Sequence, residues 1–214
     1  MACSCPEDAA LTTLTPTTCA VEIGQIQRAF FARKGNVIFD TATAGAANVP
    51  ATIANDLVTV IAGWNILKVA ADSTKVVFAP LFGGDIAINP SESITQGGND
   101  NSTRNGETYY VSTPASTFTG RFDQLSAAQT KDLKALKCED LEVYFVNEEG
   151  DIIGEASVTG QFKGFDCTNV VLGSRSVQGI ATRDSNILTF QLDADWDTYF
   201  QKQTPTDFKA LTGI

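Results

Sequence analysis

The chain has 214 residues, of which 43% are apolar and 19% charged, which is enough for one sizeable hydrophobic core. Its 15 basic and 25 acidic residues give a formal net charge of -10. That charge argues against sequence-independent binding to nucleic acid or to anionic lipid, because both need a cationic surface. Histidine is absent, which excludes Ser-His, Cys-His and His-metal sites and the usual general base near neutral pH.

The N-terminal residues, MACSCP, have neither a cationic start nor an apolar run. No segment reaches the roughly 18 to 20 apolar residues of a membrane span. We therefore expect no signal peptide, no membrane partner and folding in a cytoplasm.

The cysteines number five, at irregular spacings, which favours reduced and mostly buried thiols over a disulfide framework. They are Cys3, Cys5, Cys19, Cys138 and Cys167. A zinc site remains an alternative if the first three fold onto one of the last two. However, histidine is missing and Cys-x-Cys is not the Cys-x2-Cys of common zinc modules. We predict no cofactor and no metal.

The first elements in chain order form a predicted strand, helix, strand unit that follows an N-terminal extension over residues 1–22. Residues 36–39 (NVIF) and 57–61 (LVTVI) are short β-branched runs with a loop between them. Residues 62–71 suit a short helix, with Trp64, Leu67, Val69 and Ala71 as its apolar positions. Residues 75–79 read as a strand that Pro80 stops.

A polar stretch follows at residues 97–110, GGNDNSTRNGETYY, which contains no aliphatic side chain. Composition alone leaves a disordered linker, a substrate loop and an arm that orders on a neighbouring molecule as alternatives. Strand-like runs flank the stretch at residues 85–90 and 108–112, and Asn105-Gly106 is a strong hairpin-turn signal. We therefore predict a long hairpin, the polar arm, over about residues 84–112. Its candidate assembly residues are Gly97, Gly98, Asn99, Asp100, Arg104, Asn105, Gly106, Tyr109 and Tyr110.

The clearest helix lies at residues 126–137, SAAQTKDLKALK. Ser126 and Gln129 have the spacing of a capping box. The leucines at 125, 133 and 136 lie near one face and the lysines at 131, 134 and 137 near another. The lysine face is either solvated or in contact with an acidic neighbour.

Strands resume after this helix. Residues 141–146 alternate strictly, with Leu141, Val143 and Phe145 on one side, and a turn at NEEGD leads into residues 152–158, which predicts a hairpin with one buried face. Residues 176–183 and 187–193, separated by a turn at DSN, predict another hairpin. The C-terminal tail, about residues 196–214, is aromatic but not periodic.

The whole pattern predicts one mainly antiparallel β-sandwich or barrel domain over residues 1–214, in which helix is the minor component. Sheets of this kind have exposed strand edges that need protection or a partner.

One group of acidic residues has a composition that a metal-binding or catalytic site could use. Asp193, Asp195 and Asp197 in DADWD would form an acidic row on one side of a strand, and their spacing resembles the start of a calcium loop. Thr198 and Thr204 stand where such a loop needs glycine and a bidentate glutamate. We therefore favour a solvated or lumen-facing carboxylate row. A paired-carboxylate glycosidase needs no histidine, but no pair stands out, and we predict no enzymatic activity.

Two segments carry a resemblance to a known class of protein. GWNILKVAADSTKVVFAPLF, which runs into ITQGGNDNSTRNGETYY, and LKALKCEDLEVYFVNEEGDIIGE resemble structural proteins of tailed bacteriophages. The order strand, polar arm, strand, helix, hairpin over about residues 57–160 is similar to that of tail tube proteins. No short signature fixes the tube assignment.

This resemblance implies a subunit that joins its own copies in rings of six, stacks the rings with its arm, contacts other virion proteins and conducts DNA through an acidic lumen without specific binding. The location would be the virion tail, after synthesis in the host bacterial cytoplasm. A capsid decoration or neck ring protein is the alternative within the class. A monomeric carbohydrate-binding β-sandwich is the alternative from another class, with Trp64, Trp196 and the tyrosines as stacking platforms.

Overall fold

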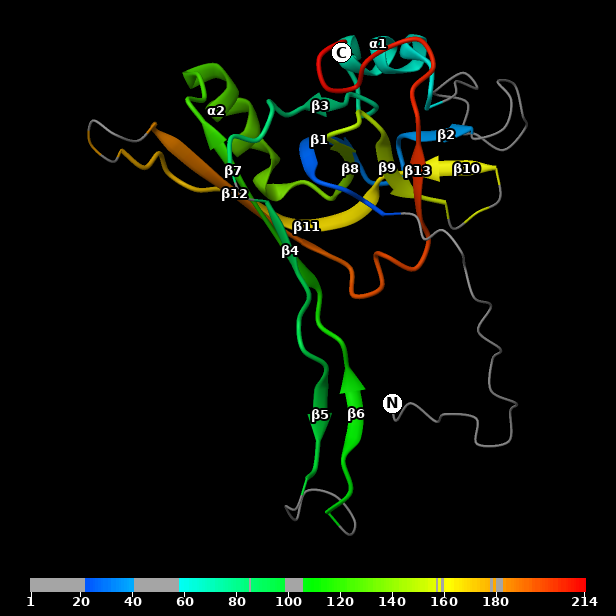
Figure 1. The fold of residues 1–214 in the computed structure, drawn as a ribbon, viewed down its shortest axis with the longest axis vertical. Helices are drawn as coiled ribbons and strands as arrows, with labels where there is room; N and C mark the ends of the chain where they lie inside the picture. Colours follow the sequence, from blue (N-terminus) through cyan, green and yellow to red (C-terminus); the bar gives the residue numbers. More distant parts are fainter. Residues whose placement is uncertain are drawn as a thin grey trace.

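The computed structural model describes residues 22–40, 58–84, 86–98, 106–156, 158, 160–177, 179 and 183–214. Within them the chain consists mainly of antiparallel strands with two α-helices, so the predicted mainly β class is confirmed (Figure 1). A hairpin leaves this body and projects far beyond it (Figure 1). None of the described helices has the length and apolar character needed to span a membrane.

The described strands are β1 (Ile26–Arg33), β2 (Ile38–Asp40), β3 (Val77–Phe78), β4 (Ala87–Asn89), β5 (Ile94–Gln96), β6 (Tyr109–Ser112), β7 (Ser116–Asp123), β8 (Leu141–Asn147), β9 (Ile152–Glu155), β10 (Gln161–Lys163), β11 (Phe165–Leu172), β12 (Ser185–Leu192) and β13 (Phe200–Gln203). The described helices are α1 (Ile61–Val69), α2 (Ala127–Ala135) and the short 3-10 helix η2 (Leu136–Cys138).

Strand β8 is the centre of the body sheet. One edge of β8 pairs with β1 along nearly its whole length, from Ile26 opposite Asn147 to Arg33 opposite Leu141. Its other edge is shared, because β9 pairs near the C-terminal end and β11 near the N-terminal end. The sheet continues from β11 through β12 and β7 to β4, and from β9 to β10 and β2, while β13 adds to β9 and β3 to β1.

Two hydrophobic cores lie on opposite faces of the β1–β8 pair. Alternate residues such as Phe31 and Phe145 point into the core that Leu133 of α2 helps to close, here called the α2-side core. The residues between them, such as Phe30 and Tyr144, point into the core that contains Trp64 of α1, the α1-side core. This two-sided burial corrects one prediction. The β8–β9 hairpin was expected to bury a single face, but every residue of β8 is buried because the strand separates the two cores.

Helix α1 confirms the predicted short helix but corrects the strand expected before it. Residues 58–60 form a turn, residue 57 lies outside the described residues, and α1 begins at Ile61. Tertiary contacts explain the difference: Val58 is buried and its carbonyl accepts a hydrogen bond of 2.8 Å from the Trp64 indole. The Asp207 carboxylate also accepts from the Ile61 backbone N–H. These contacts outweigh the β-propensity of the LVTVI run.

Helix α2 agrees closely with its prediction. Ser126 Oγ accepts from the Gln129 backbone N–H at 3.1 Å, and Gln129 Oε1 accepts from the Ser126 N–H at 2.9 Å. This reciprocal pair is the capping box. Leu133 and Leu136 are buried as expected, whereas the last predicted turn is the 3-10 helix η2.

The C-terminal third differs most from its prediction. Strand β12 begins at Ser185, inside the predicted DSN turn, and pairs with β7 and β11. In place of a strand over residues 176–183, the described part shows one isolated bridge from Ser176 to Ser185. The tail that lacked a periodic pattern contains β13, which pairs with β9 from Phe200 opposite Glu155 to Gln203 opposite Ile152.

Candidate assembly surfaces

The projecting hairpin is the feature that most distinguishes this molecule. We define it as residues 90–115, of which 90–98 and 106–115 are described. Strand β4 of the predicted polar arm is hydrogen-bonded to β7, with Asn89 opposite Thr117, so the free part begins after Asn89. Strands β5 and β6 then form a separate two-stranded sheet, with Gln96 opposite Tyr109. Figure 1 shows this sheet extending away from the body.

Every residue of β5 and β6 is exposed to solvent. Four of them have large apolar or aromatic side chains, with exposed fractions of 50% for Ile94, 49% for Tyr109, 54% for Tyr110 and 52% for Val111. Large exposed apolar side chains gathered on one element mark interaction sites. An isolated two-stranded hairpin is also only marginally stable in water. The geometry is therefore that of an element that contact with another molecule would stabilise.

Local hydrogen bonds hold the two legs of the projecting hairpin together. Ser91 Oγ donates to the Ala115 carbonyl at 2.7 Å, and the Ser93 and Thr113 hydroxyls lie 3.2 Å apart. The Tyr110 hydroxyl lies 2.9 Å from that of Thr113. With these bonds in place, Tyr109 and Tyr110 remain about half exposed.

Of the nine candidate assembly residues, five lie among the described residues. Gly97, Gly98 and Gly106 have positive φ angles of 99°, 100° and 68°, which suit glycine near a hairpin turn. Tyr109 donates to Glu107 at 2.7 Å, and this hydrogen bond to a carboxylate raises the pKa of the Tyr109 hydroxyl. The remaining candidates, Asn99, Asp100, Arg104 and Asn105, lie outside the described residues. The predicted hairpin is thus present, while its role in assembly stays a prediction.

The predicted acidic row is wrong as a strand. Strand β12 ends at Leu192, and residues 194–199 form turns, with the Trp196 N–H donating to the Asp193 carbonyl at 3.3 Å. Asp193, Asp195 and Asp197 are all exposed, but a turn does not align alternate residues. Among the described residues no cluster of three or more potential metal ligands is present.

The cysteine expectation is met at one of the two described positions. Cys167 is buried in β11, and burial raises the pKa of its thiol far above the usual range. Cys138 is exposed at the end of η2, contrary to the expectation of buried thiols. Cys3, Cys5 and Cys19 lie outside the described residues.

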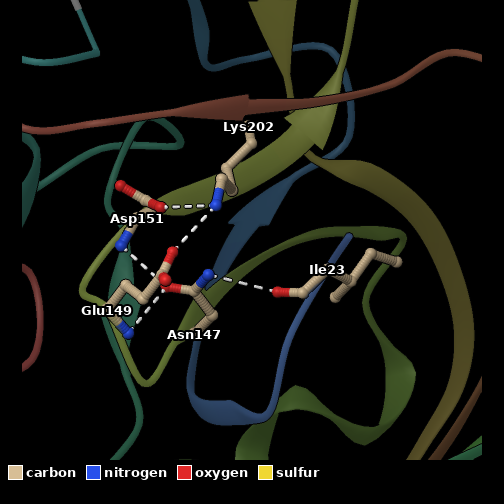
Figure 2. Close-up of polar contacts among 5 residues, drawn as sticks. All are labelled: Ile23, Asn147, Glu149, Asp151 and Lys202. Atoms are coloured by element: carbon tan, nitrogen blue, oxygen red, sulfur yellow. Dashed lines mark hydrogen bonds and ion pairs between the residues drawn. The ribbon is translucent and has the colours of Figure 1, made fainter. Parts of the chain in front are cut away.

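A polar network, drawn in Figure 2, ties the β8–β9 turn to β13 and to the segment before β1. Asn147 Oδ1 accepts from the backbone N–H groups of Glu149 and Asp151, and its Nδ2 donates to the Ile23 carbonyl at 3.1 Å. Lys202 Nζ lies 2.9 Å from Glu149 and 3.0 Å from Asp151. Hydrogen bonds to these carboxylates raise the pKa of Lys202. The network fixes β13 against β9.

A buried carboxyl group lies under the turn between β1 and β2. Glu142 is 1% exposed; its Oε1 accepts from the Gly35 N–H at 2.8 Å, and among the described residues its Oε2 has no hydrogen-bond partner. Burial raises the pKa of Glu142 to about 7. Above Glu142, Lys34 pairs with Asp166 at 2.7 Å, and Lys163 lies between Asp166 and Glu155. This cluster is structural in character, because its charges pair with one another.

The surface of the described residues includes two hollows. The larger has a volume of about 720 Å³ and lies between β3 and the α2–η2 helices, with Val76, Phe78 and Leu136 in its wall. The smaller, of about 300 Å³, is lined by Trp196, Tyr199 and several acidic groups. Of the stacking platforms expected for the carbohydrate-binding alternative, Trp64 is fully buried and Trp196 packs edge-on against Phe165, whereas Tyr109, Tyr110 and Tyr199 are exposed.

Comparison with known proteins adds a likeness to a solved structure. No protein-family model and no curated protein matches the chain. Among solved structures, the chain is similar to one from "Tail of empty GTA particle computed with helical refinement, C6 symmetry". That chain is 11% identical, over 57% of this chain and 84% of that one, with a TM-score of 0.32. A TM-score this low does not establish a common fold, so we infer function below from the geometry of this chain alone.

Proposed function

We propose that this protein is a non-enzymatic structural protein of a phage-like virion, and specifically a tail tube subunit. The observation that carries the proposal is the projecting hairpin, all of whose β5 and β6 residues are exposed, including Ile94, Tyr109, Tyr110 and Val111. A protein that worked alone would gain nothing from keeping these side chains in water. A copy of the chain or another virion protein would bury them.

Two further features support assembly. Strands β2, β3, β4 and β13 each pair on one side only within the described residues, so their other edges can extend a sheet into a neighbouring subunit. A formal net charge of -10 suits the wall of a DNA conduit, because an acidic lumen repels phosphate and lets DNA slide. Sixfold rings stacked by the projecting hairpin are the arrangement that we propose.

The test compares the full chain with a variant whose residues 91–115 are replaced by Asn-Gly, a two-residue hairpin turn that can join β4 to β7. Negative-stain microscopy and sedimentation velocity measure assembly. We expect stacked rings or tubes for the full chain and isolated rings or monomers for the variant.

The alternatives have distinct outcomes in the same experiment. Single rings from the full chain, without stacking, would favour the neck ring or capsid decoration function. A chain that sediments as a 22.8 kDa monomer at every concentration tested would contradict the proposal.

A further inference from the structure

Helix α2 and η2 carry a row of three exposed lysines, Lys131, Lys134 and Lys137, which we call the lysine row. Among the described residues none of the three has an ion-pair partner. Other described basic residues do form ion pairs within the chain: Arg33, Lys34, Arg121, Lys163, Arg175 and Lys202. Arg28, Lys68, Lys75, Arg183 and Lys209 also have no ion-pair partner among the described residues, but the lysine row gathers three such cations on one helical segment, which also carries the exposed Asp132.

The projecting hairpin carries the opposite charge. Its residues 90–115 contain three acids, Glu92, Asp100 and Glu107, and one base, Arg104, for a formal net charge of -2. The hairpin and α2 also lie at opposite ends of the molecule along its longest axis (Figure 1). A displacement of one copy along that axis therefore brings the hairpin of one copy toward the α2 end of the next.

We infer that the lysine row of one copy receives the projecting hairpin of the next copy in a head-to-tail contact. The inference rests on the proposed function, because it names the surface through which stacked copies meet. Two chains at a net charge of -10 repel each other, and opposite local charges that face one another offset part of this repulsion. Such a contact is heterologous, meaning that each copy uses two different surfaces, and it propagates into stacks.

Charge reversal tests the contact from both sides. One variant carries Lys131→Glu and Lys134→Glu, and a second carries Glu92→Lys and Glu107→Lys. All four side chains are exposed, so both variants should fold, which circular dichroism and thermal melting check. At 0.15 M salt we expect each variant alone to need at least about tenfold more protein than the unaltered chain for stacking.

The decisive step is to mix the two variants. In the mixture the reversed hairpin of the second variant meets the reversed helix of the first, and the native hairpin of the first variant meets the native lysine row of the second. We expect stacking to return to within about threefold of the unaltered chain. A variant with Lys68→Glu and Lys209→Glu, two exposed lysines outside the lysine row, is the matched control. This control keeps the native hairpin and the native lysine row, so alone it should stack at the same protein concentration as the unaltered chain.

The outcomes separate this inference from the proposed function. If the unaltered chain stacks and the lysine-row variant stacks equally well, the contact is wrong and the proposed function stands. If both single variants lose stacking but the mixture does not recover, the two surfaces do not meet and the contact is again wrong. If the unaltered chain never associates, the proposed function itself fails.

Discussion

The body and the projecting hairpin are both antiparallel β-structure, but they differ in how much of their side-chain surface they bury. Strand β7 alternates buried and half-buried residues over its full length. Strand β6, which is separated from β7 by three residues, is exposed throughout. The body buries the apolar side chains of its strands in two cores, whereas the hairpin leaves most of its own apolar surface exposed. The difference teaches that regular strand pairing does not by itself mark a self-sufficient unit, and that stability and assembly should respond to different mutations.

The largest expected effect on stability lies in the body. Phe118 is fully buried and stacks on Phe190, with ring centroids 4.3 Å apart. Phe118→Ala should lower the free energy of unfolding by about 3 to 5 kcal/mol through lost burial and a cavity. Denaturant titration measures the change. A loss below about 1 kcal/mol would mean that the α2-side core is not packed as described.

A pH-dependent effect should come next. The pKa of Glu142 is raised from 4.5 to about 7, so the stability linked to its neutral form is fully present below pH 4.5 and is lost as pH rises through 7. Glu142→Gln keeps an acceptor for the Gly35 N–H and should raise stability at pH 8 by about 1 to 3 kcal/mol. Unfolding free energies at pH 5 and pH 8 check the prediction. If the variant showed the same difference in unfolding free energy between pH 5 and pH 8 as the unaltered chain, the prediction would be wrong.

The network in Figure 2 should contribute an amount of similar size. Asn147→Ala removes three hydrogen bonds and leaves the N–H groups of Glu149 and Asp151 without that acceptor. We expect a loss of about 1 to 3 kcal/mol, measured by thermal or denaturant unfolding. The matched control is Asn65→Ala, an exposed asparagine on α1, which should change stability by less than about 0.5 kcal/mol. Equal effects at both positions would show that the network does not hold the turn.

The smallest effect on stability should come from the hairpin. Tyr109→Ser with Tyr110→Ser should change the free energy of unfolding by less than about 0.5 kcal/mol, because both side chains are about half exposed. The same variant should stack poorly, since it loses half of the large exposed groups of β5 and β6. Parallel melting and sedimentation experiments separate the two effects. Loss of stability together with normal stacking would mean that the hairpin serves stability rather than assembly.

Much of the fold could be predicted where the pattern was local. The capping box of Ser126 and Gln129 depends on a spacing of three residues. The Asn105-Gly106 turn signal stays a prediction, because Asn105 lies outside the described residues. Strands β4, β6, β8 and β9 fell inside or close to predicted runs for the same reason.

The rest could not be predicted because it depends on tertiary contacts. Strand β1 buries Ala29, Phe30, Phe31 and Ala32 in succession, so it has no alternation to detect. Strand β13 has no apolar pattern because it pairs along β9 at the edge of the sheet, where polar side chains face solvent. The exposure of the hairpin was foreseeable from its polarity, whereas the lack of ion pairs between the lysine row and the other described residues was visible only once those charges had been placed.

Hydrogen exchange of backbone amides in dilute and concentrated full-length chain tests the central claim most directly. The β8 amides lie between two paired strands and should be protected in both samples. We predict that the β5 and β6 amides exchange quickly in the dilute chain and become protected when copies associate. Protection of the hairpin in the dilute monomer, or rapid exchange of the hairpin in the associated state, would contradict the account.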